Sequence, residues 1–126
     1  MKIKTDNRNI MENIFIPTPT FEKSFKRLKK KYHSLKTDLE EFKKEYNENP
    51  NIGDDLGGGF RKIRVAIKSK NRGKSDGARI ITYDICVKAE DKAVILVEIY
   101  DKGEISILSD GEYETALKEF LESHFK

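Results

Sequence analysis

The sequence predicts an α+β domain in which a strand and two helices precede three strands and a final helix. Three segments repeat apolar residues every three or four positions, as amphipathic helices do. Three segments in the second half are alternating or continuously apolar, as strands are. With 126 residues, the chain can bury roughly two thirds of its surface, enough for one domain with a real core. We expect residues 1–10 to form a polar extension and residues 11–126 to form that domain.

The first half of the sequence predicts a short strand and a helical hairpin. Asn13–Pro17 is largely apolar and ends at a proline, which stops a strand. Apolar residues spaced four, three and four predict one helix from about Pro19 to Tyr32. The same spacing predicts a second helix that is capped by Ser34 and ends at Asn49–Pro50. Because only a short break separates the helices, they are expected to form an antiparallel hairpin packed on the sheet.

The second half predicts an antiparallel or mixed sheet. Asp54–Gly59 is rich in glycine and is expected to be a loop. Phe60–Lys68 alternates between apolar and basic residues and predicts a strand with one buried face. A second strand is expected at Arg79–Lys88 and a third at Ala93–Tyr100. The third is almost continuously apolar, so we expect it to be central and covered on both faces.

A last helix is predicted after the central strand. Ser109 and Glu112 have the spacing of a capping box, which opens a helix. The apolar side of this helix consists of Tyr113, Ala116, Leu117, Phe120 and Leu121. We expect this stripe to pack on the chain's own sheet, because the central strand would otherwise expose one apolar side.

Residues 73–75 (Gly-Lys-Ser) match the end of a nucleotide-binding P-loop. Lys68, however, occupies the position where that motif requires its first glycine. A P-loop also leads into a helix that holds the phosphates, whereas Asp76–Gly77 predicts a turn that a strand follows. We therefore exclude a P-loop.

Positive charge is concentrated in the same region. The formal net charge is +3, but residues 61–79 contain eight basic residues and one acid, a charge of +7, which leaves −4 for the rest of the chain. Such a patch is typical of proteins that bind a polyanion. The alternative is a solvated lysine-rich surface.

Several other chemistries lack the residues that they need. The two histidines, His33 and His124, and the single cysteine, Cys86, are too few for a His/Cys metal site. Cys86 has no evident basic partner that would make it a nucleophile. A lone cysteine indicates a reducing compartment, and no segment has the character of a membrane span or a signal peptide. We expect a cytoplasmic protein without a cofactor or a membrane partner.

A set of cations on adjacent strands remains as the candidate site. Alternation along the first of these strands places Lys62, Arg64 and Lys68 on one face, with Arg79 across the turn. Residues 100–102 (Tyr-Asp-Lys) follow at the exit of the central strand. Such groups can stabilise a phosphorane, and RNA supplies its own nucleophile, the 2′-OH. A metal-free ribonuclease is therefore chemically possible.

Residue type suggests different roles within this set. Arg64 and Arg79 are expected to clamp phosphate, because arginine stays charged and binds phosphate in a fork. Lys62 and Tyr100 are the candidate proton acceptors, since neighbouring cations favour the neutral form of a lysine. The alternative role for Arg64 is a salt bridge to Glu98, which projects from the same strand face as Tyr100.

Six separated segments carry a resemblance to a known family. They are FEKSFKRL (21–28), YHSLKTDL (32–39), NP (49–50), KIRV (62–65), GKSDGARI (73–80) and IYDK (99–102). In this order they resemble the RelE/ParE/HigB superfamily of bacterial toxins, and the RelE- and HigB-like members most strongly. The resemblance spans roughly Asn13 to Leu121.

The resemblance implies a RelE-like fold and a toxin of a type II toxin–antitoxin module. Such a toxin is an endoribonuclease that cuts mRNA on the ribosome and is held inactive by a cognate antitoxin. The implied catalytic residues are Lys62, Arg64, Arg79, Tyr100 and Lys102, and the implied RNA-binding residues are Lys68, Arg72 and Lys74. Close relatives commonly have Gly-Lys-Ser-Gly-Gly in the turn, and Asp76 departs from that pattern.

The same superfamily offers two alternative functions. ParE-like members inhibit DNA gyrase and are not nucleases. An inactive relative would bind nucleic acid without cutting it. Because a fold does not determine a function, the resemblance leaves both alternatives open.

Overall fold

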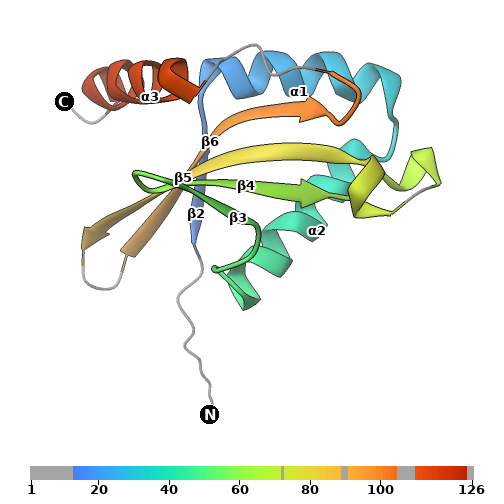
Figure 1. Cartoon of the computed structure of the whole chain (residues 1–126), viewed down its shortest axis with the longest axis horizontal. Helices are drawn as coiled ribbons and strands as arrows, with labels where there is room; N and C mark the ends of the chain where they lie inside the picture. The colour runs from blue at the N-terminus through green and yellow to red at the C-terminus, as the bar shows by residue number, and fades with distance from the viewer. Residues whose placement is uncertain (1–12, 72, 89–90, 105–109, 125–126) are drawn as a thin grey trace.

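The computed structural model describes residues 13–71, 73–88, 91–104 and 110–124, and a five-stranded mixed sheet lies at its centre (Figure 1). The strands are β2 (Ile14–Pro17), β3 (Asp54–Gly57), β4 (Phe60–Val65), β5 (Ala78–Lys88) and β6 (Asp91–Asp101), in the spatial order β2-β6-β5-β4-β3. The strands from β3 to β6 are antiparallel to their neighbours, and β2 runs parallel to β6. The described residues also form three α-helices, which are α1 (Pro19–Lys31), α2 (Leu35–Glu48) and α3 (Asp110–His124). The predicted α+β class is confirmed, and the expected extension of residues 1–10 lies outside the described residues.

β6 is central, as its apolar sequence predicts. It lies between β2 and β5, and every residue from Ala93 to Ile99 is at most 3% exposed. Hydrogen bonds from Thr18, at the start of α1, hold β2 parallel to β6. The Thr18 backbone N–H donates to the Leu96 carbonyl (3.0 Å), and the Thr18 hydroxyl donates to the Val97 carbonyl (2.9 Å) while it accepts from the Phe21 N–H at the helix start (3.0 Å).

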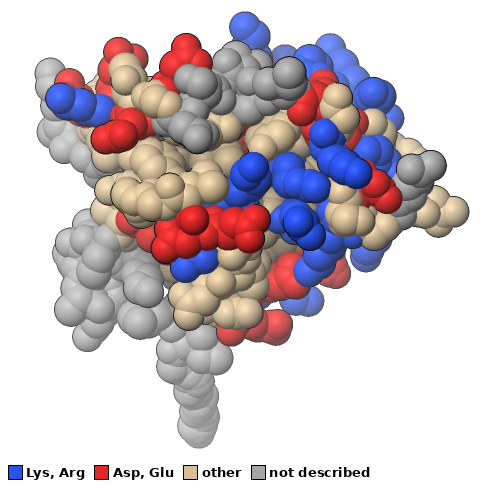
Figure 2. All heavy atoms as spheres, in the orientation of Figure 1, with Lys and Arg blue, Asp and Glu red and all other residues tan. Residues whose placement is uncertain are grey.

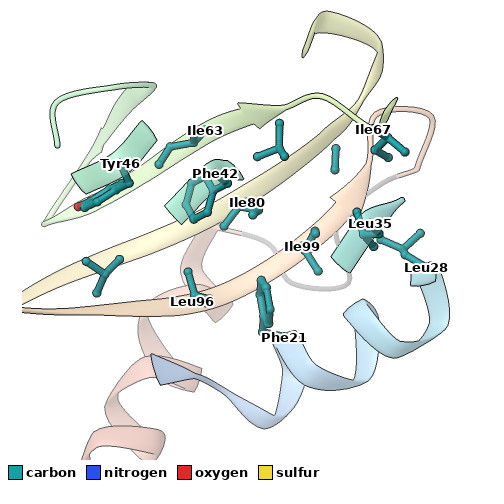
Figure 3. Packing of buried hydrophobic residues seen from close by; sticks show 13 residues of the cluster. Phe21, Leu28, Leu35, Phe42, Tyr46, Ile63, Ile67, Ile80, Leu96 and Ile99 are labelled. Atoms are coloured by element: carbon teal, nitrogen blue, oxygen red, sulfur yellow. The ribbon is translucent and has the colours of Figure 1, made fainter. Parts of the chain in front are cut away.

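The helices α1 and α2 cover one face of the sheet. Their apolar stripes pack against side chains of β4, β5 and β6 in one cluster (Figure 3). The cluster includes Phe21, Leu28, Leu35, Phe42, Tyr46, Ile63, Ile80, Leu96 and Ile99. Both helices therefore derive most of their stability from this burial, since short helices are marginal alone.

The helix α3 packs on the opposite face of the sheet, as predicted for its apolar stripe. Tyr113 and Leu117 are each 5% exposed and belong to a second cluster with residues of β4, β5 and β6. Their strand partners in that cluster are Phe60, Ile81, Ile95 and Val97, with Tyr83, Tyr100, Phe120 and Leu121 at its border. Ser109, the first residue of the predicted capping box, lies outside the described residues.

The expected loop at Asp54–Gly59 is wrong, because its first four residues form β3. They pair with β4, with Asp54 opposite Lys62 and Asp55 opposite Arg61. Gly57, the last residue of β3, and the two glycines of the hairpin turn have φ angles of +89°, +62° and +94°, a conformation that favours glycine. All four β3 residues are exposed, so no buried face produced an apolar alternation in the sequence.

The strand β4 ends at Val65 and not at Lys68 as predicted. Ile67 is still fully buried, but the chain then turns into a short 3-10 helix, η1 (Lys68–Lys70). The Lys68 N–H donates to both carboxylate oxygens of Asp38 (3.3 Å each). Ser34, the expected cap of α2, makes no side-chain cap hydrogen bond, and its hydroxyl instead accepts from the Ser69 N–H (2.8 Å). The turn after β4 is thus fixed to α2.

Candidate functional site

Three predicted site residues share the sheet face opposite α1 and α2. Arg64 lies directly opposite Arg79 in the β4–β5 pairing, and Lys62 lies two residues earlier on β4. Their neighbours Ile63 and Val65 point into the cluster beneath α1 and α2, so the three cations point the other way. We call Lys62, Arg64 and Arg79 the cationic face. Figure 2 shows Lys and Arg side chains gathered over the end of β4 and the start of β5.

The cationic face occupies the part of the sheet that α3 leaves uncovered. The cluster under α3 begins at Phe60 and Ile81, and Arg64 and Arg79 lie beyond them toward the end of the sheet. The β4 side chains of this surface therefore change from apolar to basic within four residues, from Phe60 to Arg64. The expected convergence of the three cations on one face is confirmed.

Lys62 and Arg64 form no ion pair within the described part of the chain. No Asp or Glu oxygen there lies within 4 Å of the Lys62 ammonium or of the Arg64 guanidinium nitrogens, although five other ion pairs are present. The salt bridge to Glu98, which was the alternative role for Arg64, is not formed. Glu98 is fully buried and its Oε1 accepts from the Ile99 N–H (3.0 Å). Arg64 is exposed, so its positive charge is available to a ligand.

Arg79 is held in place by the turn that precedes β5. This turn contains a second 3-10 helix, η2 (Lys74–Asp76). The Arg79 guanidinium donates to the carbonyls of Ser75 (3.0 Å), Ala78 (3.3 Å) and Lys74 (3.4 Å). A guanidinium has five N–H donors, so these bonds orient the group and leave donors for a phosphate.

Tyr100 and Lys102 border the cationic face. Tyr100 lies directly opposite Arg79 in the β5–β6 pairing and is half-buried against the cluster under α3. The Lys102 N–H donates to the Gly77 carbonyl (2.9 Å), and its ammonium group pairs with Asp76 (3.2 Å). Asp76, the departure from the family's turn, thus offsets the charge of Lys102.

Two of the predicted RNA-binding residues, Lys68 and Lys74, lie beside α2. Because β4 ends early, Lys68 does not join the cationic face, which corrects the expectation from alternation. Lys68 and Lys74 line a groove of about 470 Å³ beside α2, together with acidic residues of that helix. Lys74 forms an ion pair with Glu45. Arg72 lies outside the described residues.

A cavity of about 300 Å³ adjoins the cationic face at the edge of β4. Its charged lining consists of Lys62, Arg64, Lys74, Asp54 and Glu45. Asp54 is the residue that the sequence interpretation missed, because no pattern marked β3 as a strand. A cavity of this size with cations on one side can hold a phosphate and its attached sugar.

A partly buried ion pair supports the site from the other side of the sheet. The Asp101 carboxylate accepts hydrogen bonds from Lys70 Nζ (2.7 Å) and from the Tyr32 hydroxyl. Lys70 Nζ also donates to the Asp76 carbonyl (2.7 Å), which ties η2 to β6. Burial alone would raise the pKa of Asp101, but the hydrogen bonds from Lys70 and Tyr32 and the charge of Lys70 outweigh it and lower that pKa. Through Lys70, Asp101 therefore helps to hold η1 and η2 against β6.

No protein-family model matches the chain. Among the described residues, no three His, Cys, Asp or Glu side chains lie close enough together to hold a metal ion. No helix in that part of the chain has the length and apolar character required to cross a bilayer. The function is therefore inferred from the geometry of the cationic face and from the resemblance of the sequence segments.

Proposed function

We propose that the protein is an endoribonuclease toxin of a type II toxin–antitoxin module that cuts mRNA on the ribosome in the cytoplasm. The observation that carries the proposal is the cationic face, where Lys62 and Arg64 form no ion pair with any described carboxylate and lie beside an oriented Arg79. Like charges placed directly opposite each other on a sheet destabilise it. An arrangement of this kind is accounted for when a polyanion occupies the face.

The proposed chemistry follows from the positions of these groups. Arg64 and Arg79 hold the oxygens of the scissile phosphate and stabilise the charge that develops in the phosphorane. The RNA 2′-oxygen attacks phosphorus, the bond from phosphorus to the 5′-oxygen breaks, and a cyclic 2′,3′-phosphate remains. One proton leaves the 2′-OH and one reaches the 5′-oxygen. The resemblance supports the ribosome as the place where mRNA is presented and a cognate antitoxin as the inhibitor.

The decisive experiment is induction of the chain alone in bacteria, followed by mapping of mRNA 5′ ends. We expect growth arrest with cuts phased to codons. The Arg64→Gln variant is expected to lose both effects. Arg61→Gln is the matched control, because Arg61 lies on the same strand but on the opposite face, where it contacts the Asn51 and Ile52 carbonyls.

Two outcomes would contradict the proposal. Growth arrest with intact mRNA and gyrase-dependent DNA damage would establish the ParE-like alternative. Normal growth with intact mRNA, from a chain that still binds RNA, would establish an inactive relative.

A further inference from the structure

The strand β3 brings a carboxylate to the cationic face. Asp54 is directly opposite Lys62 in the β3–β4 pairing, and residues in this relation share a face with Cβ atoms about 4.5–5.5 Å apart. Asp54 is exposed and lines the same cavity as Lys62 and Arg64. The strand register therefore places Asp54 beside Lys62, and Arg64 lines the same cavity as both.

The proposed cleavage requires a group that accepts the 2′-OH proton. The cationic face consists of lysine and arginine, which carry a proton near neutral pH and must lose it before they can accept one, whereas a carboxylate needs no such step. Tyr100 likewise has to lose its own phenolic proton first.

The other carboxylates near the face are engaged elsewhere. Asp76 pairs with Lys102, and Glu45 pairs with Lys74. Asp55 lies opposite Arg61 in the β3–β4 register and points to the other face of the sheet. Its carboxylate accepts a hydrogen bond from the Gly57 N–H (2.8 Å). Asp54 has no ion pair within the described residues, so it remains as the accessible acceptor.

We propose that Asp54 is the general base of the reaction, an inference that rests on the proposed ribonuclease function. The 2′-OH gives its proton to the Asp54 carboxylate as the 2′-oxygen bonds to phosphorus. The bond from phosphorus to the 5′-oxygen breaks, and the Lys62 ammonium protonates that oxygen. The proton then passes from Asp54 to the neutral Lys62 amine, which restores both groups without a further reactant. Lys62, a candidate acceptor from the sequence, becomes the proton donor.

The test compares Asp54→Asn with Asp55→Asn, which remove the same charge from adjacent positions on opposite faces. Cleavage of mRNA is followed in single turnover on translating ribosomes in a cell-free extract. Asp54→Asn is expected to lower the rate constant by about 100-fold or more, while Asp55→Asn cleaves at nearly the wild-type rate. Binding of an RNA whose 2′-OH groups are methylated is expected to stay within threefold of wild type in both variants.

A pH profile separates a base from a merely structural residue. The wild-type rate is expected to rise with pH on the acidic side, and Asp54→Asn is expected to lack that rise, whereas Asp54→Glu restores part of it. Wild-type cleavage by Asp54→Asn, alongside an inactive Arg64→Gln, would overturn the role of Asp54 and leave the ribonuclease in place. Loss of binding in Asp54→Asn equal to its loss of cleavage would also overturn it. Absence of cleavage by the wild type would instead remove the proposed function itself.

Discussion

At the scale of single residues, the pairing of Arg64 with Arg79 opposes stability. The two residues are directly opposite on antiparallel strands, and like charges in that relation cost about 0.2–1 kcal/mol. Sites retained for function often carry such a cost. We predict that Arg64→Gln leaves the free energy of unfolding unchanged or raises it by up to about 1 kcal/mol. Urea denaturation measures this, and a loss of unfolding free energy greater than about 1 kcal/mol would show that Arg64 is structural.

Arg79 combines a proposed catalytic role with support of the η2 turn. Removing one donor that stabilises a phosphorane costs about 3–4 kcal/mol of transition-state stabilisation. We therefore predict that Arg79→Ala abolishes toxicity while the fold persists. Circular dichroism is the control for the fold. A toxic and fully active Arg79→Ala protein would remove this residue from the site.

At the scale of elements, β4 and β5 approach closely where the chain enters β5. A Cβ atom added to Gly77 would lie 2.0 Å from the Val65 carbonyl oxygen, whereas one added to Gly73 would meet no atom within 4 Å. We predict that Gly77→Ala destabilises the protein by about 1–3 kcal/mol and lowers cleavage through the displaced Arg79. Gly73→Ala, on the same turn, is the control with near-wild-type stability. Equal urea midpoints for the two variants would contradict this account.

The Lys70–Asp101 ion pair, which helps to hold η2 against β6, makes the free energy of unfolding depend on pH. Because the pKa of Asp101 is lowered in the folded protein, its contribution is complete above the unfolded value, about 3.9, and is lost as pH falls through the folded value. We predict that the wild type loses more unfolding free energy between pH 5 and pH 2, approximate limits set by that value, than Asp101→Asn does. At pH 7, Asp101→Asn is expected to be less stable by about 3 kcal/mol, because Lys70 is left without its carboxylate. Parallel stability curves against pH for the two proteins would contradict the prediction.

At the scale of the whole molecule, one sheet face is divided between an apolar part under α3 and a basic part that α3 does not cover. The basic part is a surface that an acidic segment of an antitoxin can shield. We predict that association with the cognate antitoxin slows as ionic strength rises, because opposite charges speed encounter. The association rate at two salt concentrations measures this. A rate insensitive to salt, with unchanged binding by a triple alanine variant of the cationic face, would place the antitoxin elsewhere.

Most of the fold followed from apolar periodicity, and the exceptions have physical causes. The helices, the central β6 and the packing of α3 were predictable, because each buries a regular stripe or run. β3 was not, because it is exposed and paired only along one edge. The end of β4 was also missed, because Ile67 continues the apolar alternation beyond the strand. The backbone turns at Lys68, whose N–H donates to the Asp38 carboxylate.

The candidate site was predictable only in part, for a similar reason. Alternation identified Lys62 and Arg64 as sharing a face, and a strand after the turn brought Arg79 beside them. No local pattern could reveal that Asp54 lies opposite Lys62, because that relation depends on the register of a hairpin whose first strand leaves no signal. The ion pairs that occupy Lys74 and Lys102 likewise join segments far apart in the chain.

The parallel pairing of β2 with β6 has a consequence for how the protein is made. Ile14 pairs with Ala93, so β2 is synthesised long before the strand that it pairs with. Contacts between distant residues close long loops and slow folding. Until β6 emerges, α1 and α2 have no completed sheet on which to bury their stripes. A nascent chain interrupted before β6 is therefore expected to be unfolded, so the helices and the sheet form together only after β6 has been synthesised.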